Sequence, residues 1–413
     1  MTRVIAAYAV DAAGSTTTSG SEATPVNVLR RTFLDSEQEA STTYLIFGWG
    51  RFGSNGATSD AGAQMRNSTA GVIFNLDKVE QKDASDFRTT MFLGTYTSAG
   101  TPVTQNIDID VWSEAGDTLT YSNLAILIIK QDGTDGVGSS LTDTTVDLDP
   151  PADKISVSFE SDGLGEYIFY AVDCITADTD FPGAIARVDI DASDVSDSDR
   201  RYTVKDVTTQ KTLHASFPHT MASGTRDVDL EIVGAGGSID DVTFRRARIF
   251  ILRKSSFDAA YSVIQNTRQT ASTNDTYEDV TGASLTQTLP AVEHWVIASL
   301  AADGNSTTIS CLHKLQQSIG GSNADIVDTI CEPGATTDRA PWGIGYFLDA
   351  TNVEHIWKFQ HAPESTSIVG SDGANIIVLQ LEASGAPPPS SIGSVFRSTV
   401  FGGTPKNIFR SLH

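Results

Sequence analysis

The sequence predicts an all-β protein made of several two-sheet sandwiches in tandem, followed by a terminal segment of a different kind. Short apolar runs rich in β-branched and aromatic residues alternate with clusters of Gly, Asp, Ser and Asn, and some of these runs recur at nearly constant spacing. Long stretches with the 3.6-residue period of a helix are missing. Abundant Ser, Thr, Gly and Asp also suit turns and strand edges better than helices.

The strand prediction rests on six short runs. Each is dense in aliphatic and aromatic residues and is bounded by turn-forming residues, as buried strands are. The runs are Tyr44–Trp49, Ala125–Ile129, Glu166–Val172, Ile249–Leu252, Trp295–Leu300 and Ile376–Leu379.

Two markers recur with the same drift, which indicates an internal repeat. The aromatic residues that open one strand, Tyr44, Tyr167 and Trp295, lie 123 and 128 residues apart. An alanine in the run that closes each repeat recurs after 122 and 127 residues, at Ala125, Ala247 and Ala374. Asp-containing turns that lead to an aromatic residue fit this spacing less well, at Lys82–Phe87, Ser196–Tyr202 and Thr336–Trp342.

We therefore expect three tandem jelly-roll-like β-sandwich modules, at residues 1–133, 134–257 and 258–383, plus an extended C-terminal arm at 384–413. Each module has room for about eight strands of five or six residues with their turns. That is the size of a jelly roll or a related two-sheet sandwich. The alternative is one large β-protein whose strands look alike only through their composition.

The arm differs from the modules in composition. Ala386–Ser391 contains three consecutive prolines and reads as a stiff, extended spacer. The residues beyond it are too few for a core of their own, but their bulky apolar and basic side chains are poor composition for disorder. We expect a docking arm that binds a partner, for example by β-augmentation, with a frayed terminus as the alternative. Its docking residues are Phe396, Arg397, Phe401, Lys406, Ile408, Phe409, Arg410 and Leu412.

The charge of the chain is strongly negative and unevenly distributed. With 28 Lys and Arg against 52 Asp and Glu the net charge is −24, of which residues 1–383 carry −27 and the arm +3. A surface this acidic repels phosphate groups, so we expect neither a nucleic-acid nor a membrane partner. The apolar run before Asp11 is only seven residues long, so the sequence predicts synthesis in the cytoplasm without a signal peptide.

No catalytic signature is present, and we predict that the chain is not an enzyme and holds no cofactor. The sequence lacks G-x-S-x-G, H-E-x-x-H, C-x-x-C and P-loop patterns. Gly234–Ser238 resembles a phosphate loop, but Asp240–Phe244 after it reads as a strand, which favours a hairpin turn. The odd cysteine number favours buried free thiols, with a Cys311–Cys331 pair as the alternative; the three are Cys174, Cys311 and Cys331.

Two kinds of feature offer metal ligands, and for both the structural interpretation is favoured. Cys311–His313 places a thiol and an imidazole on one face of a strand, but no second pair at ligand spacing accompanies it. The Asp-rich runs Asp143–Asp153 and Asp189–Asp199 could hold calcium through loop oxygens. They lack the Gly and Glu positions of an EF-hand, so solvated turns are the favoured interpretation.

Exposed tryptophans would be candidates for a glycan-binding face. Trp49 and Trp295 fall in the repeated apolar strand, where core packing is favoured. Trp342 and Trp357 are the possible glycan contacts. They carry the alternative function of a carbohydrate-binding adhesin or receptor-binding protein that recognises a host surface glycan.

The repeated module resembles jelly-roll-like modules in structural proteins of tailed bacterial and archaeal viruses. The resemblance is carried by Tyr167–Val172, Lys82–Phe87 and Arg245–Leu252, and it covers most of 30–383; the third copy departs from it at Gly373–Asn375. It implies a non-enzymatic virion component, such as a capsid decoration, fibre or tail-associated subunit on the external surface. The implied partners are other virion proteins, capsid or tail, and further copies of the chain in a homo-oligomer. A polysaccharide depolymerase is a third possibility, which would need a clustered acid pair.

Overall fold

The computed structural model describes residues 4–383, with short segments left out. Helical structure in the described residues is confined to single 3-10 turns such as Asp35–Glu37 and Lys254–Ser256. No helix in this part of the chain is long and apolar enough to cross a lipid bilayer. The segments left out are 18–21, 56–59, 81–86, 114–116, 147–151, 177–182, 196–197, 204–209, 236–241, 274–275, 307–309, 332–337 and 366, and the arm at 384–413 also lies outside the described residues.

The first eight strands form a sandwich, called module 1 below. One sheet has the order β1-β8-β3-β6 and the other the order β2-β7-β4-β5. The first strand therefore pairs with the eighth, and the second with the seventh. The strands are β1 (Val4–Thr17), β2 (Val26–Phe33), β3 (Thr43–Ser54), β4 (Asp60–Asn67), β5 (Val72–Glu80), β6 (Arg88–Thr97), β7 (Gln105–Ser113) and β8 (Thr118–Lys130).

The next group of strands, module 2, repeats this order with its first strand divided in two. Its sheets run β9/β10-β17-β12-β15 and β11-β16-β13-β14. The strands are β9 (Gly136–Ser140), β10 (Thr144–Val146), β11 (Ala152–Ser161), β12 (Glu166–Thr176), β13 (Gly183–Ile190), β14 (Arg200–Thr203), β15 (Gln210–His219), β16 (Gly224–Ala235) and β17 (Val242–Arg253).

The third group, module 3, has the same order again, and its first strand is also divided. Its sheets run β18/β19-β26-β21-β24 and β20-β25-β22-β23. The strands are β18 (Ala260–Gln265), β19 (Gln269–Ala271), β20 (Glu278–Thr288), β21 (Glu293–Gly304), β22 (Cys311–Ile319), β23 (Ser322–Cys331), β24 (Ala340–Asp349), β25 (Glu354–Pro363) and β26 (Val369–Gln380), and β27 (Glu382–Ala383) follows.

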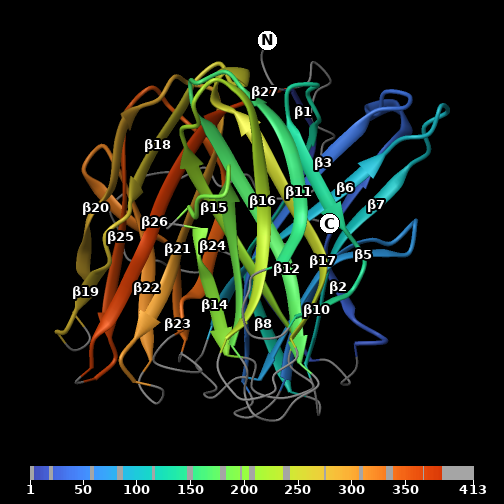
Figure 1. Cartoon of the computed structure of the whole chain (residues 1–413). Coiled ribbons are helices and arrows are strands. Elements are labelled where there is room, and N and C mark those ends of the chain that lie inside the picture. Colours follow the sequence, from blue (N-terminus) through green and yellow to red (C-terminus); the bar gives the residue numbers. More distant parts are fainter. Residues whose placement is uncertain are drawn as a thin grey trace, which may run out of the picture.

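Each of these sandwiches has the strand order of a jelly roll, so the prediction of an all-β, jelly-roll-like fold is confirmed. The six predicted runs lie in β3, β8, β12, β17, β21 and β26, the two central strands of one sheet in each module. Central strands buried on both faces read as continuous apolar runs, which explains why these strands carried the clearest signal. In Figure 1 the modules follow one another from blue through green to red, side by side.

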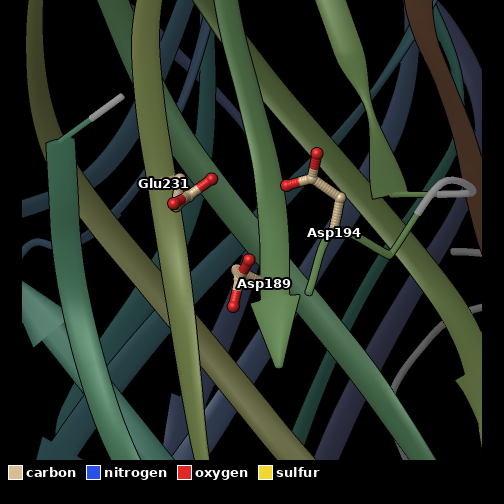
Figure 2. A group of neighbouring side chains, drawn as sticks. All are labelled: Asp189, Asp194 and Glu231. Carbon is tan, nitrogen blue, oxygen red and sulfur yellow. The ribbon is translucent and has the colours of Figure 1, made fainter. Parts of the chain in front are cut away.

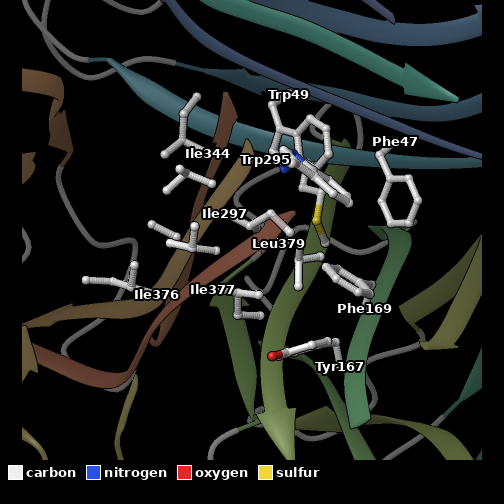
Figure 3. Packing of buried hydrophobic residues seen from close by; sticks show 14 of the residues in the cluster. Phe47, Trp49, Tyr167, Phe169, Trp295, Ile297, Ile344, Ile376, Ile377 and Leu379 are labelled. Atoms are coloured by element: carbon white, nitrogen blue, oxygen red, sulfur yellow. The ribbon is translucent and has the colours of Figure 1, made fainter. Parts of the chain in front are cut away.

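The three sheets that contain these runs share one central core. Ile46 of β3 packs inside module 1, whereas its neighbour Phe47 belongs to a cluster that joins all three modules. The Phe47 ring lies 5.2 Å from Phe169 of module 2 and 4.9 Å from Trp295 of module 3, centroid to centroid. Figure 3 shows these rings converging with Trp49 and aliphatic residues of β26. Each inner sheet is therefore buried on one face by its own sandwich and on the other by its neighbours.

The modules are joined in a closed ring, fifth strand to sixth. Gln210 of β15 pairs with Lys78 of β5, which links module 1 to module 2 in one continuous sheet. Arg201 of β14 forms a bridge with Arg339, just before β24, and links module 2 to module 3. The third junction, between β23 and β6, returns to module 1. Because each module uses the same two edges, the contacts follow one heterologous pattern that closes on itself.

A β-bulge recurs in the eighth strand of every module. Two residues of β8, β17 and β26 lie opposite one residue of the third strand, where the register shifts at Trp49/Arg51, Ala171/Asp173 and Ser299/Ala301. The first bulged residue has a positive φ each time: 53° at Asn123, 49° at Arg246 and 52° at Gly373. The departure of the third copy at Gly373–Asn375 is thus the same bulge made with glycine.

The bulge also corrects the alignment of the predicted markers. Ala247 and Ala374 directly follow the residue of positive φ, whereas Leu124, not Ala125, does so in module 1. The turn markers are not equivalent either, since Phe87 directly precedes the sixth strand of module 1 and Trp342 lies in the sixth strand of module 3, whereas Arg200 to Tyr202 belong to the fifth strand of module 2. The spacing of the markers therefore reveals the repeat, but in module 1 it selects Ala125, one residue after the structurally equivalent Leu124.

Candidate functional site

The outer edge of β1 is the longest strand edge that module 1 presents. On its inner side β1 pairs with β8 from Ile5 to Thr17. On its outer side the described residues contribute only β27, which runs parallel to β1 and pairs Val4 with Glu382 and Ile5 with Ala383. Within the part of the chain that the structure describes, the backbone groups of β1 beyond Ile5 have no strand partner on this side, which makes a surface suited to β-augmentation.

Contacts with module 3 hold β1 in place. The Tyr8 hydroxyl donates to Glu293 Oε1 at 3.2 Å, and its ring lies 4.4 Å from the Phe347 ring. Burial, followed by the charge of Glu293, raises the pKa of Tyr8, so the hydroxyl stays protonated and remains a donor. Val10, two residues on, is 45% exposed. The edge is therefore fixed at one end and open along its continuation.

The predicted arm residues Phe396, Arg397, Phe401, Lys406, Ile408, Phe409, Arg410 and Leu412 all lie outside the described residues. What the structure adds is where the arm starts. Glu382 and Ala383 lie at the edge of β1, close to the N-terminal end of the chain, and both β1 and β27 are seen at the upper end of the molecule in Figure 1.

A carboxylate cluster lies on the outer sheet of module 2. Asp189 at the end of β13, Asp194 in the following turn and Glu231 of β16 bring carboxylate oxygens within 4.8 Å of one another (Figure 2). Arg187 binds two of them, with Nη1 2.9 Å from Asp194 and Nε 2.7 Å from Glu231. Burial raises the pKa of both Asp189 and Glu231. Oxygen ligands of this kind suit a hard cation, but the guanidinium already neutralises part of their charge.

This cluster contains only part of the predicted Asp-rich run. Asp191 points instead to Arg226, 2.9 Å away, and Asp199 lies near Arg339. Glu231 was missed because it comes from a strand 37 residues beyond Asp194, and only the cross-strand pairing of Arg187 with Glu231 brings it near.

A polar cavity of ≈ 430 Å³ lies at the junction of modules 2 and 3. Its charges are largely paired with one another: Arg268 binds Asp303 through two hydrogen bonds of 2.6 and 2.7 Å, and Arg339 binds Asp372. We interpret this cavity as part of the seal between two modules. Its lining residues are Ile185, Asp199, Arg201, Arg268, Asp303, Asp338 and Arg339.

The Cys311–His313 pair does not form a metal site with other described side chains. The Cys311 thiol donates to the backbone oxygen of Asp303 at 3.4 Å, and His313 Nε2 lies 3.1 Å from Gly370 O. The neighbouring ring, His361, lies 6.2 Å away, and burial lowers the pKa of both histidines to about 4. Neutral, buried imidazoles that are hydrogen-bonded within module 3, His313 to a backbone oxygen and His361 to the Ser371 hydroxyl, fit packing.

Cys174 and Cys311 are buried thiols. The backbone of Cys311 lies directly opposite that of Cys331, whose side chain is outside the described part.

The expected hairpin turn at Gly234–Ser238 is wrong. Strand β16, which contains Gly234, and the strand after it, β17, belong to different sheets, so the segment between them does not join the two strands of a hairpin.

The tryptophans correct the expectation of a glycan face. Trp342 is 2% exposed and its indole donates to Thr329 at 2.7 Å. Trp357 is fully buried and donates to Tyr346 at 2.6 Å. Each polar atom has a partner inside module 3, so neither ring is available at the surface. Trp49 and Trp295 are buried in the common core, as predicted.

No family model matches the sequence, and no curated protein does. Similar solved structures include one described as a triple jelly roll fold and turret assembly in an archaeal virus, with 10% identity, 92% of each chain covered and a TM-score of 0.19. Another is the infectious bursal disease virus Gt strain, with 9% identity over 62% of this chain and 70% of that chain and a TM-score of 0.22. A tandem CBM22 domain of Paenibacillus barcinonensis Xyn10C has 8% identity over 60% of this chain and 92% of that chain, with a TM-score of 0.19. TM-scores this low transfer no function to this chain.

Proposed function

We propose that this chain is a non-enzymatic structural subunit of a virus particle, of the decoration, fibre or tail-associated type found in tailed viruses. Its acidic modules face the medium on the external surface, and residues 384–413 dock it onto other virion proteins. Its structural units are 1–133, 134–257 and 258–383.

The observation that carries the proposal is the closed ring. One chain supplies three sandwiches whose inner sheets bury both faces, with the Phe47, Phe169 and Trp295 rings at their common centre. The inner sheets of this body are enclosed, and the second sheet of every module faces outward. A multi-sheet block whose binding segment extends from one end is the arrangement expected of an assembly subunit.

The distribution of charge also supports separate roles for the modules and the arm. The modules carry −27 and the arm +3, so the arm is attracted to acidic surfaces that the body itself repels. The arm starts beside β1, at the end of the last module. The carbohydrate-binding alternative loses the two tryptophans on which it rested, because both are buried.

The test is co-sedimentation of purified protein with virus particles. Deleting 386–413 should abolish association with particles and leave the circular dichroism spectrum and thermal midpoint of the body unchanged. A matched control replaces 392–413 with a Gly/Ser segment of equal length, which keeps the reach of the arm and removes its side chains; it should also fail to associate. Normal association of either variant would contradict the proposal.

A further inference from the structure

We propose that segment Val395–Phe401 of one copy adds as a strand to the outer edge of β1 in a second copy of this chain. The inference rests on the docking role of the arm proposed above and names its partner and its receiving surface. Two features of the structure and two of the sequence support it.

The first feature is an asymmetry among the three modules. In modules 2 and 3 the strand equivalent to β1 is interrupted, as β9/β10 and β18/β19, and an interrupted edge is a poor template for a further strand. Strand β1 is a single strand over Val4–Thr17, and its one register shift against β8 lies near its start, between Ile5 and Ala7. Among the described residues its outer side carries only the two pairs made by β27. Module 1 alone therefore keeps the first strand of its inner sheet as one undivided edge strand.

The second feature is that β27 pairs with the start of this edge, while the prolines that follow β27 in the sequence oppose further pairing. β27 pairs Glu382 with Val4 and Ala383 with Ile5, so a continuation in the same register would set Pro387 to Pro389 opposite Ala9 to Asp11. Proline has no N–H to donate to a strand ladder. Three consecutive prolines at these positions disfavour further pairing of the same arm with β1.

The sequence beyond the prolines supplies a strand of suitable length. Val395–Phe401 reads V-F-R-S-T-V-F, rich in β-branched and aromatic residues, and at about 3.3 Å per residue it spans roughly 23 Å. The open stretch Ala9–Thr17 is slightly longer. Arg397 is the only charge in the segment, and the body that receives it is acidic.

The spacer favours a second copy over the same copy. Residues 384–394 can extend to about 36 Å, and the triproline within them holds an extended, left-handed path of about 3.1 Å per residue. A stiff extended spacer carries the following strand away from the edge that it has just left, which suits exchange between neighbouring copies.

The test is the self-association of the purified full-length chain, measured by sedimentation velocity over a range of concentrations. Thr399→Pro and Val400→Pro are compared, because successive N–H groups of a strand point to opposite sides and one of the two substitutions removes a ladder donor. That variant should weaken self-association at least tenfold. The matched control Asn407→Pro, in the same arm but outside the segment, should leave it unchanged.

The receiving edge is tested with Ala9→Pro and Val10→Pro. Successive N–H groups of a strand point to opposite sides, so one of the two substitutions removes a donor from the open side only. That variant should fold, as judged by its thermal midpoint, and should not self-associate. Mixed with the arm variant that does not self-associate, whose β1 edge is intact, it should form a 1:1 complex.

Three outcomes would overturn the inference. They are unchanged self-association of both Thr399→Pro and Val400→Pro, a wild-type chain that stays monomeric at every concentration, and a monomer whose arm is protected from hydrogen exchange, which would place the arm on its own β1. None of them decides the particle-docking proposal, because that proposal is measured separately by co-sedimentation with particles.

Discussion

Asp77 is a buried charge on which the junction of modules 1 and 2 depends. Its carboxylate lies 2.7 Å from Arg88 Nε and 3.2 Å from Lys211 Nζ of the next module, and it accepts the Thr212 backbone N–H at 3.1 Å. Burial alone would raise the pKa of Asp77, but the charges of Lys211 and Arg88 outweigh it and hold that pKa well below its usual value. The carboxylate therefore stays ionised between two cations.

Removing this charge should destabilise the protein strongly. Asp77→Asn leaves two buried cations without their anion, and we expect a loss of about 3 kcal/mol in the free energy of unfolding at pH 7. The unfolded chain, with an ordinary carboxyl pKa of about 3.9, takes up its proton before the folded one as pH falls. The stabilisation by Asp77 is therefore complete above pH 5 and declines below pH 4, and the gap between wild type and variant should narrow there.

Urea unfolding at pH 7 and pH 3 measures both effects. The control is Asp191→Asn, which removes an exposed carboxylate 2.9 Å from Arg226 and should leave the urea midpoint unchanged. An Asp77→Asn midpoint equal to that of wild type at pH 7 would show that the ion pairs do not stabilise the junction.

Single residues are also where sequence-based prediction is weakest here. Trp342 and Trp357 lie in strands β24 and β25, and nothing in their local pattern tells which side of the sheet is covered. The carboxylate cluster could not be predicted for the same reason, since Glu231 reaches Asp194 only through the pairing of β13 with β16. Burial and clustering depend on strand neighbours that are distant in sequence, and these positions carry no short-range signal.

At the scale of elements, the repeated bulge gives the eighth strand its role in the ring. Asn75 of module 1 donates its Nδ2 to the backbone oxygen of Arg246, and Asn123 donates its Nδ2 to the backbone oxygen of Ile326 in module 3, both at 3.0 Å. In module 3 Asp372, next to Gly373, binds Arg339 of the same module, and the backbone of Arg339 in turn bridges to Arg201 of module 2. In modules 1 and 2 the bulged residue therefore contacts the fifth strand of the preceding module directly, and in module 3 its neighbour does so through Arg339.

The positive φ of the bulge predicts how Gly373 tolerates substitution. Gly373→Val should cost about 1–2 kcal/mol, because a branched side chain disfavours the left-handed conformation. Gly373→Asn should cost less, since asparagine tolerates this conformation and occupies the equivalent position in module 1, Asn123. Valine and asparagine are similar in size, so the difference in their thermal midpoints reports the backbone. Equal midpoints for the two variants would refute a conformational cause.

At the scale of the whole molecule, the sequence predicts the fold class and the repeat but not the ring. The inner strands are apolar on both faces, which makes them visible in the sequence and also builds the common core. The junctions depend on isolated contacts such as Gln210 with Lys78 and Arg201 with Arg339. Contacts of one or two residues leave no periodic pattern, so the way the modules close could not be derived from spacing.

The common core predicts that destabilising one module also destabilises the others. Substitutions at two neighbouring residues distinguish this coupling from the local destabilisation that a substitution inside one module causes. Phe47→Ala empties the site where three modules meet, and Ile46→Ala removes a side chain inside module 1 only. Both should lower the free energy of unfolding, by about 3–5 and 2–5 kcal/mol respectively. Hydrogen exchange should rise in β12 and β21 as well as β3 for Phe47→Ala, but only within β1–β8 for Ile46→Ala. If the increase for Phe47→Ala also stays within β1–β8, the modules are stable independently and the shared aromatic cluster does not couple them.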